Sequence, residues 1–308
     1  MKKVSVIMPN YNHAPYLKER MDSILAQDYP DIEVIVLDDA STDESTDILQ
    51  SYKSHPKIKK LIFNPVNSGN TFLQWQRGLK ESTGEYVWIA ESDDVAEPDM
   101  LSRLVETMER ENAVVTFSQS KCIDEQGKII HRLVTAPFLH SFAMDGVEYA
   151  RHYLLGENTI CNASAVVFRR DVAKEIDLNK VAEYRVSGDR LFWILVAMKG
   201  KVAFVAEPLN GFRQHTHKVS ISAAGKGVNC IQDHRIFQFV RPQLPLTVYD
   251  MICICGYHWQ AMHMPWVTAD GLQAASEEWQ QEPYFGRWSW IVYKCHRAII
   301  RLKGACSI

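Results

Sequence analysis

The sequence has no run of about 18 uncharged apolar residues, the length that a membrane-spanning helix needs, so we expect no transmembrane segment. It has no excess of basic residues either, because 34 Lys and Arg stand against 37 Asp and Glu and the net charge is −3. That balance gives no support for a nucleic-acid partner. Proline soon interrupts the short apolar run near the N-terminus, so we expect no signal peptide.

The seven cysteines are odd in number and scattered, and they lack the C-x2-C spacing of a zinc site. Reduced thiols in a cytoplasmic protein are therefore the expectation. A glycine-rich phosphate loop is absent as well, because the turn after the first predicted strand is Pro9-Asn10-Tyr11-Asn12. A nucleotidyltransferase on a similar sheet would need such a loop, so this class of enzyme is disfavoured.

The sequence does contain a regular alternation of short apolar runs and amphipathic segments. Strands are predicted at residues 4–8, 32–37, 58–63 and 86–90, and helices at 16–27, 45–52, 72–81 and 100–111. This alternation predicts an α/β fold with a doubly wound, mostly parallel sheet.

Later segments continue the sheet and then give way to helices. We predict strands at 114–118, 128–134, 163–168 and 202–205, a helix at 190–198, and a loop at 210–220. Gly225 and Gly227 mark the predicted boundary between a catalytic domain at 1–223 and a helical C-terminal region at 224–308.

The strand predicted at 86–90 runs directly into Glu91, Ser92, Asp93 and Asp94. In open α/β sheets the ligand crevice lies at the carboxyl ends of the strands. Adjacent carboxylates repel each other, and a divalent cation that carries a phosphorylated substrate would relieve this repulsion. The alternative is a helix-capping role, but the next helix has its own start around Pro98. The acidic pair therefore predicts a site for Mg²⁺ or Mn²⁺ with a diphosphate.

A second acidic pair, Asp38 and Asp39, ends the strand predicted at 32–37. Ser41 and Glu44 have the spacing of a capping box, which would cap the next helix and leave both carboxylates for a ligand. The alternative is a pair of solvated turn acids, because Asp is common in turns.

Four motifs, in this order, resemble those of the inverting family-2 glycosyltransferases over residues 3 to 220. They are Val-Ser-Val-Ile-Met-Pro-Asn-Tyr-Asn at 4–12, Glu-Val-Ile-Val-Leu-Asp-Asp-Ala-Ser-Thr-Asp at 33–43, Gly-Glu-Tyr-Val-Trp-Ile-Ala-Glu-Ser-Asp-Asp at 84–94, and Gly-Asp-x-x-x-Trp at 188–193. The resemblance implies a GT-A fold and a metal-dependent enzyme that transfers a sugar from a nucleotide donor with inversion.

The resemblance also implies roles for single residues. Asp39 would contact the nucleobase and Asp93 the ribose, Asp94 would ligate the metal, and Asp189 would be the catalytic base. Pro9 and Tyr11 match the turn that lines the nucleotide in the family. Apart from the resemblance, we expect Asn12, Asp38 and Asn70 on the nucleotide side, Arg213 pairing the diphosphate from a loop that closes over it, and His215 as a second metal ligand. A solvated loop is the alternative for Arg213, His215 and His217, and stabilisation of a helix dipole is the alternative for Asp189.

The chemistry of the transfer asks for the same residue types. An ionised carboxylate can accept the N3–H of uracil, which favours a UDP-hexose donor, and a single displacement needs a general base at the acceptor hydroxyl. Two positions depart from the family pattern, because Glu91 stands where Asp is frequent and Gly188 stands where an acidic residue is frequent. The second departure keeps a catalytically silent nucleotide-sugar binding protein as the alternative function.

The Gln-x-x-Arg-Trp signature of the family's processive members is absent. We therefore expect one sugar to be added per encounter, to a glycan or lipid-linked glycan in the synthesis of a cell-surface polysaccharide.

Residues 287–303 form a predicted basic helix with tryptophans, and Lys294, Arg297 and Arg301 would share one of its faces. Such a helix can lie on an anionic membrane, here the inner face of the cytoplasmic membrane. The alternative is a helix packed on the catalytic domain. Trp259 and Trp266 are predicted as core residues or as contacts in a homo-oligomer.

Overall fold

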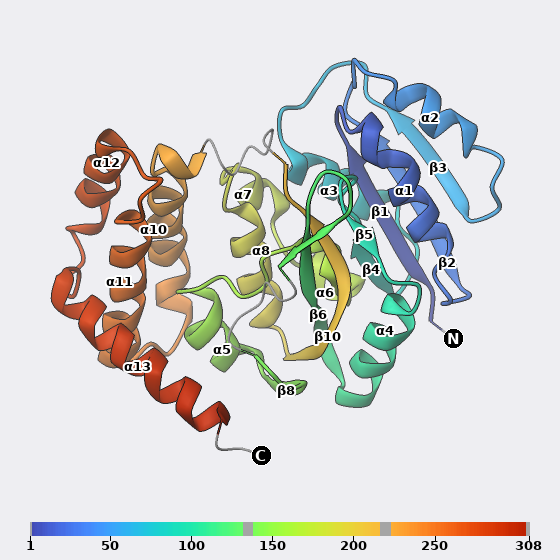
Figure 1. Ribbon diagram of the computed structural model, residues 1–308. Helices are drawn as coiled ribbons and strands as arrows, with labels where there is room; N and C mark the ends of the chain where they lie inside the picture. Colours follow the sequence, from blue (N-terminus) through green and yellow to red (C-terminus); the bar gives the residue numbers. More distant parts are fainter. Residues whose placement is uncertain (1, 132–137, 216–222, 306–308) are drawn as a thin grey trace.

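The computed structural model describes residues 2–131, 138–215 and 223–305. Within these residues ten strands form one sheet in the order β3-β2-β1-β4-β9-β6-β10-β5, with β7 added to β6 and β8 to β10 (Figure 1). The strands are β1 (Val4–Asn10), β2 (Ile32–Asp38), β3 (Ile58–Phe63), β4 (Tyr86–Ile89), β5 (Val95–Ala96), β6 (Ala113–Ile123), β7 (Ile129–His131), β8 (Phe142–Asp145), β9 (Val166–Arg169) and β10 (Lys201–Arg213). The strands β1 to β4 are parallel to one another, which confirms the predicted doubly wound sheet.

Helices cover both faces of this sheet. One face carries α1 (Ala14–Leu25), α2 (Ser45–Ser51) and α4 (Met100–Glu111). The other carries α3 (Thr71–Glu81), α5 (Gly146–Tyr149) with the π-helical turn η1 (Ala150–Leu154), α6 (Arg170–Lys174), α7 (Leu178–Ala182) and α8 (Gly188–Ala197). The C-terminal helices are α10 (Val228–Val240), α11 (Val248–Met262), α12 (Ala269–Trp279) and α13 (Arg287–Ala305), and short 3₁₀ turns lie at Ala163–Ala165 and Arg241–Gln243.

The side chains of β1 alternate between two hydrophobic cores. Val6 and Met8 belong to the core under α1 and α4, whereas Ile7 belongs to the core under α3 and α8. All seven residues of β1 and all seven of β2 are buried, and a buried Val or Ile side chain stabilises the fold by about 1.5–3 kcal/mol. The apolar strands therefore fix the middle of the sheet, and their polar carboxyl ends meet at one edge.

The strand β9 runs antiparallel between β4 and β6, against the direction of its neighbours. It thereby brings the turn before it beside the end of β4. The indole N–H of Trp88 donates to the carbonyl of Ser164 (2.8 Å), and the N–H of Glu91 donates to the Ser164 hydroxyl (3.1 Å). The strand predicted at 163–168 is confirmed from Val166 onward, but its direction was not predictable from its composition.

The strand β10 corrects two expectations. We expected Pro208 to end a strand and a loop to follow at 210–220, but β10 continues to Arg213. The pairing register of β10 with β6 shifts on both sides of Pro208, so the proline, which has no N–H to donate, lies in a bulge within the strand. The continued strand carries Arg213 and His215 to the end of β4. His217 lies outside the described residues, as do residues 132–134 of the strand predicted at 128–134.

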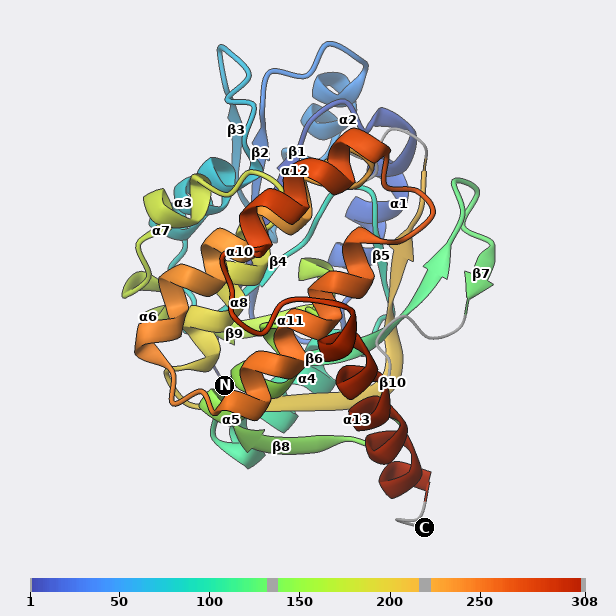
Figure 2. The same ribbon diagram turned by 90° about the vertical axis from the view of Figure 1, so that its left-hand side faces the viewer.

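The C-terminal helices lie beyond α7 and α8, on the side of the molecule opposite β1 to β3 (Figures 1 and 2). Within the described residues they share a core with the rest of the chain, because the hydrophobic cluster under α3 and α8 continues through Phe237, Ile254 and Trp279. The division at 223/224 into two domains stays a prediction, and the helical nature of the C-terminal region is confirmed.

Helix α13 packs closely on α11. A Cβ atom at Gly256 would lie only 2.2 Å from the backbone oxygen of Ser289. Arg297 pairs with Glu157 at 2.8 Å, and 11% of its side chain is exposed, so it does not join Lys294 on the exposed basic face that we predicted. The side chain of Arg301 lies outside the described part. These contacts show that one face of α13 packs on the rest of the chain, and a membrane contact of its other face stays a prediction. In the described ranges we find no helix both long and apolar enough to cross a bilayer.

Candidate active site

The acidic end of β4 lies against the end of β10 and the turn before β9. Asp94 accepts the backbone N–H of Arg213 at 2.9 Å through Oδ1 and the side-chain amide of Asn162 at 3.0 Å through Oδ2. Asn162 is itself fixed, because its Oδ1 accepts the N–H of Ser164 at 2.7 Å. Both oxygens of Asp94 therefore tie segments of the fold together.

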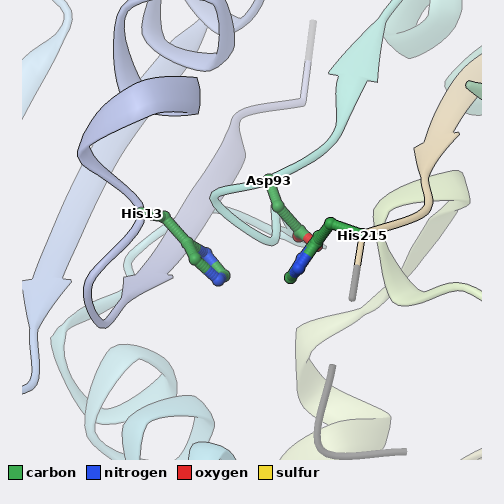
Figure 3. Close-up of side chains that lie close together, drawn as sticks. All are labelled: His13, Asp93 and His215. Carbon is green, nitrogen blue, oxygen red and sulfur yellow. The ribbon is translucent and has the colours of Figure 1, made fainter. Parts of the chain in front are cut away.

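The neighbouring carboxylate of Asp93 lies in a group of three metal-ligating side chains. The ligand atoms of His13, Asp93 and His215 all lie within 4.8 Å of one another, and the three side chains point toward a common centre (Figure 3). His13 comes from the turn after β1, Asp93 from the end of β4, and His215 from the residues after β10. Three distant parts of the sequence thus converge at the carboxyl edge of the sheet, where a ligand is expected.

The spacing of these atoms suits a divalent cation. Two ligand atoms that each lie about 2.1 Å from one ion at a right angle are about 3 Å apart, and Oδ2 of Asp93 lies 3.1 Å from Nε2 of His215. The Nδ1 atom of His13 contacts the hydroxyl of Ser92 at 2.8 Å, a contact that orients the imidazole. Two imidazoles with one carboxylate favour a first-row transition ion such as Mn²⁺ over Mg²⁺, which prefers oxygen ligands.

A buried arginine lies behind the acidic turn. Arg20 on α1 is 0% exposed, lies 4.8 Å from the Trp88 ring, and donates from Nη2 to the Ser164 hydroxyl at 3.3 Å. Burial lowers the pKa of Arg20 to about 10, while the charges of Asp94 and Asp93 oppose this shift. The guanidinium therefore stays charged at neutral pH and offsets part of the negative charge of the turn.

Glu91 stands at the start of the same turn and accepts the indole N–H of Trp75 at 3.0 Å. Burial, and then the charge of Asp93, raise the pKa of Glu91 to about 8. Its carboxyl group therefore carries a proton at neutral pH, which removes one like charge from the neighbourhood of Asp93.

The end of β2 pairs with the end of β1, where Asn10 lies opposite Asp38. Asp38 accepts the Asn10 amide at 2.8 Å and the Ser41 hydroxyl at 2.6 Å. Ser41 therefore does not cap α2, whose N-cap residue is Glu44 without a side-chain bond. The predicted capping box was wrong, because the short side chain of Ser41 closes a local turn with Asp38 instead.

Asp39 organises the loop between β3 and α3. Its carboxylate accepts the side-chain amides of Asn64 (2.7 Å) and Gln74 (2.8 Å) and the hydroxyl of Ser68 (2.7 Å). The amide of Asn67 donates to the Asp39 carbonyl at 3.0 Å. Asp39 thus shapes the loop that we predicted to line the nucleotide, and its contact with a nucleobase stays a prediction.

The other residues predicted on the nucleotide side have different surroundings. Tyr11 is 46% exposed at the turn after β1, whereas Pro9 is buried within β1. Asn12 accepts the N–H of Thr42 at 2.7 Å and so ties this turn to the loop after β2. Asn70 caps α3 by accepting the N–H of Phe72 at 3.0 Å, which is a structural role. Tyr11 is therefore the member of this group best exposed for stacking on a base.

Arg213 has a structural role at the end of β10. Its guanidinium is buried with 1% of the side chain exposed and pairs with Glu19. It donates to the carbonyls of Asp93 (2.7 Å), Asp124 (2.9 Å) and Glu125 (3.0 Å). These bonds occupy donors that a diphosphate contact would need, and the phosphate contact of Arg213 stays a prediction. In the structure Arg213 fixes the backbone of Asp93.

Asp189 is the second residue of α8, because the helix begins at Gly188, two residues before the start at 190 that we predicted. Burial raises the pKa of the Asp189 carboxyl to about 6, opposed first by a hydrogen bond from the Arg190 N–H and by the Arg190 charge. A carboxylate with that pKa is ionised at neutral pH and more basic than an ordinary aspartate, which suits a general base. The dipole of α8 favours the same ionised form.

Gly188 is explained by packing. A Cβ atom at this position would lie 2.5 Å from the ring of Phe72 on α3 and 2.7 Å from the backbone oxygen of Val181. An acidic side chain at this position, which we noted as frequent in the family, has no room here. The absence of that acid is therefore the result of the close approach of α8 to α3 and α7.

We expect Gly188→Ala to destabilise the fold by about 1–3 kcal/mol, the cost typical of overpacking. Gly156→Ala is the matched control, because its new Cβ would lie 3.8 Å from Tyr257, an ordinary contact distance. Thermal unfolding of both variants checks this expectation. An unchanged melting temperature for Gly188→Ala would contradict the packing explanation.

The sheet is doubly wound, and carboxylates and imidazoles gather at the carboxyl ends of its strands, where α/β proteins bind their ligands. The sequence model of glycosyl transferase family 2 matches residues 5–177, more than half of the chain. The chain belongs to this family and is a glycosyltransferase.

Relatives with curated sequences include an uncharacterised glycosyltransferase of Nostoc sp., 31% identical over 227 residues that cover 72% of this chain and 68% of the relative. A putative teichuronic acid biosynthesis glycosyltransferase of Bacillus subtilis, TuaG, is 28% identical over 65% of this chain and 74% of its own length.

Solved structures with a similar fold include S. aureus TarS (residues 1–349) in complex with UDP-GlcNAc, with a TM-score of 0.58 at 18% identity, covering 96% of this chain and 92% of the other. The mannosyltransferase PcManGT of Pyrobaculum calidifontis, in complex with GDP-Man and Mn²⁺, has a TM-score of 0.55 at 16% identity. The match covers 97% of this chain and 81% of the other. At these identities the likeness supports the GT-A fold alone.

Sequence reasoning missed several residues of the site: His13, Ser92, Asn162, Ser164 and Arg20. The histidine had a signal that could have found it, since it lies three residues after the end of a strand whose carboxyl end faces the ligand. The contacts of Asn162 and Ser164 depend on the antiparallel insertion of β9, which left no signal in the sequence.

Proposed function

We propose that this glycosyltransferase is metal-dependent and inverting, and that it moves one sugar from a UDP-hexose to a glycan or lipid-linked glycan. The observation that carries the proposal is the convergence of His13, Asp93 and His215 at the carboxyl edge of the sheet. A divalent ion held by these residues could bind a diphosphate, since such ions combine one or two carboxylates with substrate phosphates.

The ligands of the ion are proposed as Asp93, His215 and His13 rather than Asp94. Asp94 accepts hydrogen bonds from Arg213 and Asn162 through both oxygens. Asp93 and His215 form a hydrogen-bonded pair at 3.1 Å, and this distance also equals the separation of two ligands of one ion. The sequence-based assignment gave the metal to Asp94 and the ribose to Asp93. The two assignments predict different effects of substituting Asp93 and Asp94.

The residues of the site divide the work of the transfer. When bound, the ion neutralises charge that develops on the departing diphosphate. Tyr11 stacks on the base, and the loop shaped by Asp39 encloses it. Asp189 takes the proton from the acceptor hydroxyl as that oxygen attacks the anomeric carbon, so the sugar is transferred in one displacement with inversion. The close packing at Gly188 gives a structural reason for the missing acid, and we favour an active transferase over a catalytically silent binding protein.

The donor and acceptor classes are supported by similar proteins. UDP-GlcNAc is the ligand of a TarS structure with the same fold, and TuaG is described as a putative enzyme of teichuronic acid biosynthesis. We propose a role in cell-surface polysaccharide synthesis on this basis. A thermal-shift screen of nucleotide sugars with Mn²⁺ tests the proposal, because a donor at 100 times its dissociation constant stabilises by about 2.7 kcal/mol. A screen in which UDP-sugars give no shift, while other nucleotides do, would refute the UDP assignment.

The C-terminal helix also supports a peripheral membrane contact. Trp288 (47% exposed), Ile291 (53%) and Ile299 (51%) recur at helical spacing on α13, with Lys294 exposed beside them. We propose that this stripe lies on the cytoplasmic face of an anionic membrane. Binding to anionic liposomes should weaken on Trp288→Ser with Ile291→Ser and should fall as salt rises. Equal binding of the double variant would exclude this surface.

A homo-oligomer through Trp259 or Trp266 stays a prediction that light scattering can test.

A further inference from the structure

Two consecutive residues of α10 hold the start of α8, the helix that carries Asp189. The side-chain oxygen of Gln232 accepts the backbone N–H groups of Val186 and Ser187, each at 3.0 Å. Ser187 is the N-cap residue of α8 but makes no side-chain capping bond within its own helix. A helix start leaves backbone donors without partners inside the helix. Here a side chain from the C-terminal region accepts the N–H of the N-cap residue Ser187 and that of Val186 just before it.

Asp233 holds the same turn through side chains. Its carboxylate pairs with Nη1 of Arg190 at 3.0 Å, and it also accepts the Ser187 hydroxyl. Arg190 is 5% exposed and Asp233 is 9% exposed, so water screens this pair little. Arg190 further donates to the carbonyl of Gly156 at 3.0 Å. Asp189 lies between Ser187 and Arg190, and both of these neighbours are bound to α10.

We propose that Gln232 and Asp233 are positioning residues that set the place of the Asp189 carboxylate, so that the C-terminal helices complete the catalytic site. This inference rests on the proposed role of Asp189 as the base. A base must lie within hydrogen-bond reach of the hydroxyl that it deprotonates, and a displacement of about 1 Å can cost about 100-fold in rate. A contact two or three residues from the base, made by another helix, is the kind of support that such accuracy needs.

The charges around Asp189 give this proposal a signature that mere support of the fold would lack. Arg190 on its own helix and Asp233 on α10 are the charged groups that act most on the carboxyl. On the other elements packed against α8, Lys180 pairs with Glu183, Arg151 pairs with Asp250 and Glu148, and His258 lies 3.9 Å from Asp233. Burial lowers the pKa of His258 well below its usual range, so it stays neutral.

Gln232→Ala is the main test, because it removes two hydrogen bonds to the α8 start without leaving a buried charge. We expect a loss of about 10–100-fold in transfer with UDP affinity in Mn²⁺ unchanged. Arg235→Ala is the matched control on α10, since 58% of the Arg235 side chain is exposed and it pairs with Glu278 on α12. It should keep wild-type transfer. Retention of more than half of the transfer by Gln232→Ala overturns the proposal, and so does a parallel loss of UDP binding.

The pH dependence of transfer supplies the second readout. Gln232→Glu keeps an acceptor for both N–H groups and adds a negative charge near Asp189. At high pH it should therefore show more transfer than Gln232→Ala. The acid limb, which is the fall in transfer rate at low pH, should move to higher pH. Asp233→Asn removes a negative charge near Asp189, so its acid limb should move to lower pH. Shifts in these opposite directions support the proposal, and unshifted limbs overturn it. The wild-type chain, measured in the same assay, distinguishes failure of the proposed function from failure of the positioning role. If the wild-type chain transfers no sugar, the proposed function and this inference both fail. If it does transfer sugar, the variants test the positioning role alone.

Discussion

Asp189→Asn is expected to reduce sugar transfer at least 100-fold, within the 10²–10⁴-fold range of general-base catalysis, while UDP affinity in Mn²⁺ stays near normal. The amide keeps the shape of the side chain but lacks the basic oxygen that accepts the acceptor's proton. A loss of that size corresponds to about 3–5 kcal/mol of barrier. Transfer assays paired with calorimetric UDP titration measure the two effects separately.

A carboxylate that only complements the dipole of α8 would behave differently. Its loss would cost about 0.3–1 kcal/mol of stability and little rate. If Asp189→Asn retains more than about a tenth of wild-type transfer, the loss in rate is less than one decade. Glu183 and Glu91 would then be the next candidates for the base. Glu183 is exposed and pairs with Lys180, and Glu91 is protonated at neutral pH, so neither is a strong candidate.

The pH profile adds an independent check on Asp189. Because burial raises the pKa of this carboxyl to about 6, it takes up a proton as the pH falls through that value and can then no longer act as a base. The ratio kcat/KM should therefore fall below pH about 6 in the unaltered enzyme. A flat profile down to pH 5, well below that raised pKa, would contradict the assignment.

The second large effect is expected at the metal site. Asp93→Asn and His215→Ala should each weaken Mn²⁺-dependent UDP binding. The loss should exceed about 10–100-fold, the reduction in metal affinity that follows when a residue that only hydrogen-bonds a metal ligand is removed. His13→Ala should also weaken it. Titration of each folded variant with UDP, in Mn²⁺ and in EDTA, measures the loss, and the EDTA values should be the same for all of them.

Asp94→Asn is the matched comparison. In this variant the new side-chain NH2 group would face the NH2 group of Asn162, and neither could accept a hydrogen bond from the other. The variant should therefore lose about 1–3 kcal/mol of stability, as for a buried donor left without an acceptor. Its Mn²⁺-dependent UDP affinity should fall far less than that of Asp93→Asn. The reverse order, with Asp94→Asn losing the metal and Asp93→Asn keeping it, would restore the assignment taken from the sequence.

Local sequence patterns were sufficient to predict the sheet and most of its elements. The apolar runs of β1, β2 and β4 are long enough to be buried on both faces, and the family motifs lie at their ends. Those features also placed Asp93 and Asp94 at the carboxyl edge of the sheet. The parallel pairing of β1 with β4, which a pattern of alternating strands and helices implies, brings them beside the turn after β1. His215 reaches the same edge because β10 continues past Pro208, which the sequence did not predict.

The sequence did not predict contacts made over long distances. Whether a proline ends a strand or lies in a bulge depends on its neighbour, and for Pro208 that neighbour is β6. Arg213 resembles a phosphate ligand in sequence, but the carbonyls of Asp93, Asp124 and Glu125 surround it in the fold. The contacts of Gln232 with α8 join residues 45 and 46 positions apart, and no local spacing indicates them.

The most direct test of the central claim is a calorimetric titration of the unaltered chain with UDP, once in Mn²⁺ and once in EDTA. If His13, Asp93 and His215 hold an ion that carries the diphosphate, UDP should bind at least about 10-fold more tightly in Mn²⁺, a difference of about 1.4 kcal/mol. Equal affinity under both conditions would contradict a metal-dependent donor site.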